Sequence, residues 1–364
     1  MNHMSSDIEM YSQEDLETIR DNFVKEIEAG ISGKASSLQC IRNPLPSQSV
    51  VADGAVFQVI TIGGSHMKKA LMKKVGNKAE ILSREESSVP IFSDQEVFFS
   101  FIQANLDPNV NNLVINLAQA LEPVMRNNLL DGKMIHATKE HLFDGLLGKV
   151  VGEELENYLK EKHQRKIRIS VGNDQVILVL AGLADHSWEN LIAGIVGTGV
   201  DFGICSDQST IINLESGGFS KFTPTETGII IDKESEKPGQ FIFEKEVSGR
   251  YLICHYNLLV TNSQCTTTEE LSQIADEGQS DNSPIAQKLF ERSASLIAAQ
   301  LAGIFQYKKQ PNLVCAMEGS VFWHGWHYQD MVKDYLQKLA VPAESIKFVD
   351  IQDNSLHGAA RLII

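Results

Sequence analysis

The sequence predicts an α/β protein with two related halves around a cleft. A glycine-tipped strand–turn–strand pattern occurs twice, with its turns at Gly63-Gly64-Ser65 and Gly197-Thr198-Gly199. Helix-like segments lie beside both patterns, so strands and helices alternate along the chain. The chain has 364 residues. It therefore exceeds the roughly 250–300 residues at which a single core usually divides into domains.

The first half begins with a helix and continues into strands. Ser12-Gln13-Glu14-Asp15 forms a capping box, and apolar residues at helical spacing extend the predicted helix to about Ala29. A second capping box at Ser93-Asp94-Gln95-Glu96 predicts a helix to Ile102. The other elements predicted here are strands over 57–62, 70–72, 80–82, 113–117 and 166–171, and helical segments over 142–164.

The second half repeats the alternation. A strand ends at Gly172-Asn173-Asp174 and is followed by an apolar helix, and the next strand, over 191–196, leads into the second glycine turn. A long helix is predicted over 284–307, where Ala298-Ala299 and Ala302-Gly303 would permit close approach of another backbone. Strands near 312–317 and 346–350 alternate with one more helix.

Composition restricts the partners and the compartment. The formal charge of −15 disfavours a nucleic-acid partner, but it does not exclude ATP, which is bound by local amides and a metal. No apolar stretch reaches the ~18 residues of a membrane span, and the N-terminus lacks the apolar core of a signal peptide. The five cysteines are scattered singly, as expected of free thiols in a reducing compartment. We therefore expect a cytoplasmic protein without a membrane partner.

Two kinds of local pattern suit phosphoryl transfer. The reaction needs amides and cations around the phosphates, a metal, and a carboxylate near the attacking hydroxyl. The glycine turns let backbone N–H groups approach phosphate, although such turns are more often simple hairpins. Asp174, between a strand and a helix, is either a general base or only an N-cap.

Other polar residues are weaker signals. Thr138-Lys139, Glu215 and Glu244 could bind a polyol, although each alone is more often a solvated surface residue. His324 and His327 lie beside tryptophans and could form a metal pair or an aromatic patch. Because a third ligand is missing, a surface or packing role is favoured.

Several segments, taken in order, carry a resemblance to a known family. The most specific runs from Lys237-Pro238-Gly239-Gln240 through Glu244-Lys245 and Ser248-Gly249 to Tyr251-Leu252. It is similar to N-P-G-Q-x-x-x-E-K-x-x-S-G-x-Y-L of the hexokinase family, and the resemblance extends from about Leu16 to the C-terminus. The other matching blocks are 61–69, 131–139, 172–175, 195–201, 213–219, 271–274, 318–322 and 353–360.

The resemblance implies two actin-like ATPase (ribonuclease H-like) lobes around an interlobe cleft. Residues 1–55 and 173–364 would form the large lobe, and 56–172 the small lobe. The implied activity is transfer of the γ-phosphate of ATP, with Mg²⁺, to the 6-hydroxyl of a hexose such as glucose, by a monomer or homodimer. Asp174 would accept the hydroxyl proton. The hexose would bind Thr138, Lys139, Asn173, Asp201, Glu215 and Glu244. The nucleotide would bind Gly63, Gly64, Ser65, Lys68, Gly197, Thr198, Gly199, Thr268 and Ser355.

The chain also departs from the family pattern. Thr61 stands where the family has an aspartate that orients the metal through water. Lys68 replaces an arginine, Asp201 replaces an asparagine, and Leu356 replaces a glycine of the nucleotide loop. Ala118-Gln119-Ala120 replaces a serine-phenylalanine-proline sugar segment. The alternative function is therefore a catalytically impaired, hexokinase-like sugar sensor or binding protein.

Overall fold

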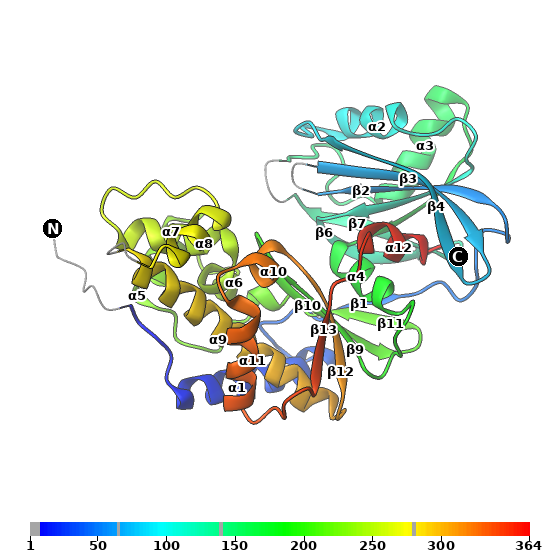
Figure 1. Ribbon diagram of the computed structural model, residues 1–364. Coiled ribbons are helices and arrows are strands. Elements are labelled where there is room, and N and C mark those ends of the chain that lie inside the picture. The colour runs from blue at the N-terminus through cyan, green and yellow to red at the C-terminus, as the bar shows by residue number, and fades with distance from the viewer. Residues whose placement is uncertain (1–7, 64–65, 138–140, 279–281) are drawn as a thin grey trace. The chain divides into compact units, whose positions relative to one another are not determined.

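The computed structural model describes residues 8–63, 66–137, 141–278 and 282–364 and is α/β, as predicted (Figure 1). Its elements divide between two compact units. Unit 1 comprises Met1–Cys40, Ile192–Gly203 and Leu214–Asp350, and unit 2 comprises Ile41–Leu191, Ile204–Asn213 and Ile351–Ile364. The predicted lobe boundaries differ from this division at 41–55, 173–191, 204–213 and 351–364, and they stay a prediction.

Unit 2 is built on a five-stranded sheet in the order β4-β3-β2-β5-β8. Strand β2 runs antiparallel to β3 and parallel to β5, and β5 is parallel to β8. Helices α2 (Gln95–Ala104) and α3 (Val151–His163) lie on one side of this sheet, and α4 (Asp174–Gly182) and α12 (Asn354–Ala360) pack together on the other (Figure 1). The strands are β2 (Val56–Ile62), β3 (His66–Val75), β4 (Lys78–Ser88), β5 (Asn112–Leu117) and β8 (Arg168–Gly172).

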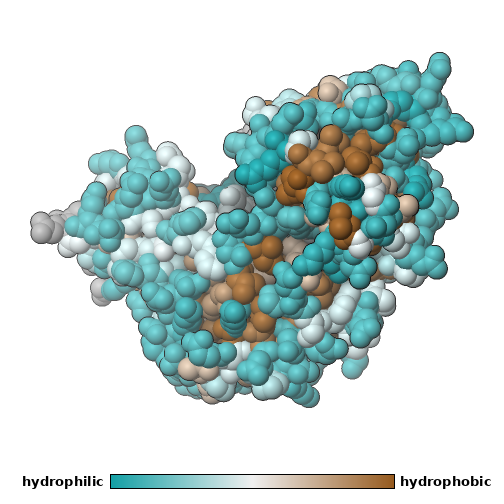
Figure 2. All heavy atoms as spheres, turned by 45° about the vertical axis from the view of Figure 1, so that its right-hand side comes forward, coloured by the Kyte–Doolittle hydropathy of each residue, from teal (hydrophilic) through white to brown (hydrophobic). Residues whose placement is uncertain are grey.

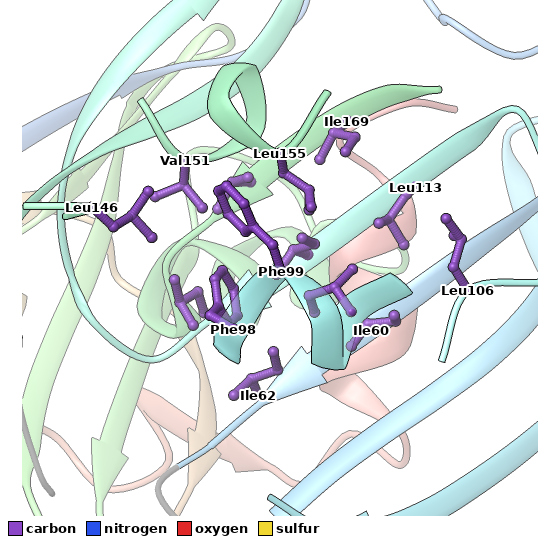
Figure 3. Close-up of a cluster of buried hydrophobic side chains, with 14 of the residues drawn as sticks. Ile60, Ile62, Phe98, Phe99, Leu106, Leu113, Leu146, Val151, Leu155 and Ile169 are labelled. Carbon is purple, nitrogen blue, oxygen red and sulfur yellow. The ribbon is translucent and has the colours of Figure 1, made fainter. Parts of the chain in front are cut away.

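The apolar core of unit 2 lies between this sheet and helices α2 and α3 (Figure 3). Ile60 and Ile62 of β2 point into the core, where they join Phe98 and Phe99 of α2. Successive side chains of a strand point to opposite faces of the sheet. Thr61, between the two isoleucines, therefore points to the side of α4 and α12.

A β-hairpin that sequence patterns did not predict completes unit 2. It consists of β6 (Ala120–Arg126) and β7 (Leu129–His136), which pair antiparallel. The residues between the strands, Asn127 and Asn128, have φ of 51° and 60°. Two residues with positive φ are typical of a type I′ turn, and asparagine tolerates this conformation better than most residues.

Unit 1 contains the long helix α9 (Ser283–Lys308), which packs against α1 (Gln13–Ile31). The capping box predicted at Ser12 is confirmed, with Ser12 and Asp15 bonding each other's backbone. The predicted close approach of another backbone at Gly303 is also confirmed. A Cβ atom there would lie 3.2 Å from the carbonyl oxygen of Arg20 and 3.0 Å from the ring of Phe23.

A six-stranded sheet has the order β1-β11-β10-β9-β12-β13, and the division into units runs through β10 (Val200–Asp207). The other strands are β1 (Ile41–Pro44), β9 (Leu191–Val196), β11 (Thr210–Asn213), β12 (Leu313–Glu318) and β13 (Ile346–Val349). The remaining helices are the short 3₁₀ helix η1 (Ser216–Gly218), α5 (Glu226–Glu234), α6 (Ile242–Val247), α7 (Gly249–Leu259), α8 (Thr268–Asp276), α10 (Ser320–His324) and α11 (Tyr328–Lys338).

Two predicted helix boundaries were wrong. The helix predicted from residue 142 begins only at Val151, because Phe143, Gly145 and Gly148 have φ of 49°, 79° and 77° and break the helical path. The helix predicted to be capped by Ser93 is capped by Asp94, whose Oδ1 accepts from Val97 N at 2.9 Å. Both errors concern local backbone conformation rather than the choice of element.

Hydrophilic side chains cover most of the face drawn in Figure 2, and hydrophobic side chains gather there in a few patches. Strand β4, at one end of the order in unit 2, is exposed along most of its length, and its Leu82 is 53% exposed. Within the described ranges, every helix is too short or too polar to cross a lipid bilayer.

Candidate active site

The predicted base lies where β8 passes into α4 in unit 2. Asn173 is the N-cap, and its Oδ1 accepts from Gln175 N at 2.9 Å. Its amide nitrogen donates to Gln119 O at 3.2 Å. Asp174 is the first residue of α4, and its Oδ1 approaches the same Gln175 N at 3.0 Å. Asn173 thus caps the helix, so the half-buried carboxylate of Asp174 is not needed as the cap.

The phosphate hairpin predicted from sequence is β2–β3 of unit 2. Gly63 follows β2, and its N–H donates to His66 O at 2.9 Å. Lys68 lies directly across from Thr61, and its Nζ is 3.9 Å from Glu86 Oε1 of β4. Thr61 is only 6% exposed. Where the resemblance implies a metal-orienting carboxylate, the chain therefore has a buried, neutral threonine.

The other residues predicted to bind ligands in this half are only partly described. Gly64, Ser65, Thr138 and Lys139 lie outside the described residues. Ser355 is half-buried in α12. Leu356 has no exposed surface, so its bulk fills the interior of unit 2 rather than projecting into solvent.

Three predicted sugar-binding carboxylates come together in unit 1. Glu244 Oε2 accepts from Val200 N at 3.2 Å, directly after the second glycine turn. Asp201 Oδ1 accepts from Ser216 N at 2.8 Å, next to Glu215, which has φ of 52°. Asp201 therefore holds the turn that carries Glu215.

The second glycine turn, also in unit 1, is surrounded by backbone. Gly197 O accepts from Gly249 N, the first residue of α7, at 2.7 Å. A Cβ atom on Gly249 would lie 2.7 Å from Cγ2 of Thr268, the first residue of α8. Gly319 has φ of 115°, and a Cβ atom there would lie 2.2 Å from Val196 O. The starts of α7 and α8 thus meet beside the turn, and helix N-termini favour negative charge.

A buried ionic cluster in unit 2 was missed by sequence reasoning. Arg126 of β6 pairs with Asp131 of β7 at 2.9 Å and with Glu156 of α3 at 2.8 Å. Asp131 also accepts from Gly152 N at 2.9 Å and Glu153 N at 3.1 Å, at the start of α3. The cluster ties the hairpin to α3. Its only sequence signal was an arginine five residues before an aspartate, which is too common to be specific.

A second buried polar residue, Asn116 of β5, was also missed. It is 6% exposed, and its Oδ1 has no hydrogen-bond partner among the described residues. The signal for it was available, because Asn116 is the one polar residue inside the apolar run Leu113-Val114-Ile115-Asn116-Leu117.

The remaining candidates behave as expected of structural residues. His324 and His327 are both exposed. Throughout the described part of the chain, no three His, Cys, Asp or Glu side chains are grouped so that they could hold a metal ion. All five cysteines are free thiols, as predicted.

Comparisons with known proteins show similarity to hexokinases in sequence and in fold. A sequence model of the hexokinase family matches residues 192–262 and 260–364. Hexokinase-2 of Solanum tuberosum is 25% identical, over 95% of this chain and 87% of its own length. Hexokinase-7 of Oryza sativa subsp. japonica is 25% identical, over 92% of this chain and 90% of its own length. The solved hexokinase from Schistosoma mansoni, complexed with glucose, superposes with a TM-score of 0.77 at 18% identity, over 97% of this chain and 95% of that one.

The fold is therefore that of the actin-like ATPases and sugar kinases, as predicted. Within this class, the chain is similar to the hexokinases, whose family model matches residues 192–262 and 260–364 and of which the two plant relatives above are each 25% identical to it.

Proposed function

We propose that this protein is an ATP-dependent hexose kinase that transfers the γ-phosphate of ATP to the 6-hydroxyl of a hexose such as glucose. The observation that supports this most is the arrangement of Asn173 and Asp174 at the start of α4. Asn173 caps the helix, and the half-buried carboxylate of Asp174 follows it directly in the family-like segment Gly172-Asn173-Asp174-Gln175. Asp174 accepts the hydroxyl proton while the hydroxyl oxygen bonds to the γ-phosphorus. The bond from that phosphorus to the bridging oxygen breaks, and ADP leaves.

The residues of unit 1 support binding of both reactants. The turn at Gly197-Thr198-Gly199, with Thr268 beside it, offers backbone donors for phosphate oxygens. Asp201, Glu215 and Glu244 offer acceptors for sugar hydroxyls. We propose a cytoplasmic location, since five free thiols suit a reducing compartment. The proposed oligomeric state is a monomer or homodimer.

The residues around Thr61 fit a magnesium ion that keeps its water ligands. Mg²⁺ usually retains several waters and needs few direct protein ligands. Neutral oxygens at Thr61 and Asn116, both buried, could accept hydrogen bonds from such waters. When bound with ATP, the ion supplies positive charge to the phosphate oxygens.

The test is a coupled assay of ADP release against a panel of hexoses, with Asp174→Ala as the matched variant. We expect hexose-dependent turnover that the variant lacks. The alternative, a sugar-binding protein with impaired catalysis, is favoured by the neutral residue at position 61. It would give no turnover, yet glucose or a related hexose would bind in calorimetry. A folded protein with neither turnover nor binding would overturn both functions.

A further inference from the structure

The polar side chain of Asn116 lies in a row that crosses the sheet of unit 2. Thr61 of β2 pairs with Lys68 of β3 and with Asn116 of β5, and Asn116 pairs with Gly172 of β8. Paired residues share a face of a sheet, and neighbouring strands lie about 4.8 Å apart. The row therefore faces α4 and α12, opposite the core of Figure 3.

Neither Gly172 at one end of this row nor Lys68 at the other supplies a hydrogen-bond donor to Asn116 Oδ1. Toward β8, a Cβ atom on Gly172 would lie 3.0 Å from methyl groups of Ile177 and Leu362, so this side is apolar. Toward β3, the amino group of Lys68 is 3.9 Å from Glu86, a residue on the far side of Lys68 from Thr61. Among the described residues, no donor bonds Asn116 Oδ1.

A buried acceptor without a donor destabilises a fold, because the group has lost its hydrogen bond to water. Asn116 is 94% buried, as its exposed fraction is 6%. A side chain in this position is expected to receive its donor from a water molecule or a ligand. Ionised phosphate groups cannot supply it, since their oxygens only accept.

We propose that Asn116, together with Thr61, accepts hydrogen bonds from water in the hydration shell of the magnesium ion that accompanies ATP. This inference rests on the proposed kinase function. It assigns to the neutral side chains of Thr61 and Asn116 the role that the resemblance implies for one metal-orienting aspartate. The pair lies at the ends of β2 and β5, next to Gly63, where the phosphate hairpin turns. Partners of this outer-sphere kind typically change metal affinity 10–100-fold when removed.

The test measures binding of a non-hydrolysable ATP analogue by calorimetry, with and without Mg²⁺, at constant ionic strength. In the unaltered chain we expect Mg²⁺ to strengthen nucleotide binding. Asn116→Leu should reduce that gain about 10–100-fold, with little effect on binding of the metal-free analogue. Loss of the oxygen itself should not lower the melting temperature, because that atom has no described partner. Asn116→Asp keeps an acceptor and adds charge, so the gain should be retained or increased.

Asn112→Leu is the matched control. Asn112 lies on the same strand and face, four residues away, and its Oδ1 accepts from Arg168 Nε at 3.1 Å. It should leave the magnesium effect unchanged.

Three results would overturn the inference alone. An unchanged magnesium gain in Asn116→Leu would mean that the side chain holds only a structural water. A loss in Asn116→Asp as large as in Asn116→Leu would mean that the amide donates to phosphate. A loss confined to hexose affinity would place a sugar hydroxyl at Asn116. Absence of any nucleotide binding by the unaltered chain would instead overturn the kinase proposal, and this inference with it.

Discussion

At the start of α4, the side chain of Asn173 caps the helix, and this bears on the role of its neighbour Asp174. The sequence left Asp174 as either a helix cap or a base, because both roles place an aspartate between a strand and a helix. The structure gives the cap to Asn173. The role of Asp174 as a base stays a prediction, and the sequence did not single out Asn116, whose position matters only because strands pair across the sheet.

Replacing Asp174 by asparagine should separate catalysis from folding. Asp174→Asn removes the proton acceptor, so we expect turnover to fall about 10²–10⁴-fold. The melting temperature should stay unchanged, because Asn173 still caps α4. Asn173→Ala is the contrast and should cost about 0.5–2 kcal/mol in the free energy of unfolding. Full turnover in Asp174→Asn would exclude this residue as the base.

Restoring a carboxylate at position 61 should strengthen the response to magnesium. Thr61→Asp places negative charge opposite Lys68, close to the proposed metal, and should raise turnover at low Mg²⁺. Titration of activity with Mg²⁺ checks this, with Asp174→Ala in the same background expected to remain inactive. If the unaltered chain already turns over at low Mg²⁺ and Thr61→Asp gives no gain, neutral oxygens are sufficient for the metal.

At the scale of elements, helix α3 is capped at its N-terminus by Asp131, a residue of strand β7. It begins after Val150, which makes no side-chain cap. Asp131 of β7 accepts from the N–H groups of Gly152 and Glu153 instead. A cap that comes from a hairpin cannot be recognised from local sequence, where S/T-x-x-E patterns are the signal. This explains why the sequence placed this helix start too early, while it found the starts of α1 and α2 to within a residue.

Removing this cap should destabilise the chain strongly. Asp131→Ala leaves the half-buried guanidinium of Arg126 with Glu156 and the carbonyl of Ile169, and it removes the acceptor of two N–H groups at the start of α3. We expect a loss of about 3–5 kcal/mol, typical of breaking a buried ion pair on one side. The control on the same hairpin is Glu122→Ala, whose carboxylate is 3.4 Å from Lys133 and 56% exposed. That surface pair should contribute about 0–1 kcal/mol. Denaturant unfolding with equal losses for both variants would contradict the capping role.

For the molecule as a whole, the sequence predicted the alternation of strands and helices and the glycine turn at Gly197-Thr198-Gly199. Local patterns do not show the division into units, because each unit is assembled from segments far apart in the chain. The sequence also could not predict buried charge. In unit 1, Glu246 lies 3.9 Å from His255 and 3.7 Å from Arg292, and all three are almost fully buried.

This cluster should make the stability of the chain depend on pH. Burial, with a contribution from Arg292, lowers the pKa of His255 from 6.5 to about 3. The neutral ring fits its contacts, with Nε2 2.9 Å from Lys245 O and Nδ1 2.7 Å from the hydroxyl of Thr227. Between pH 6.5 and 3, the unfolded chain binds a proton here that the folded chain does not. The free energy of unfolding should therefore fall with falling pH, by up to about 1.4 kcal/mol per pH unit.

The variant His255→Gln isolates this contribution. Burial raises the pKa of Glu246, which acts in the opposite direction, so the comparison must be between the two proteins rather than between two pH values. Urea unfolding at pH 7 and pH 5 should show a smaller decrease for the variant. Equal decreases would mean that His255 is protonated in the folded state.

The exposed strand β4 has a consequence for how copies of this chain meet. A strand at the end of a sheet offers unpaired backbone groups to any other strand, and an apolar one invites fibril-like growth. Here the strand carries Lys78, Glu80, Arg84, Glu85 and Glu86 along its length, with Leu82 among them. A second copy approaching edge to edge would have to strip water from these charged side chains. We therefore expect the protein to resist aggregation at high concentration. Substitutions that neutralise the charged side chains of β4 should reduce this resistance.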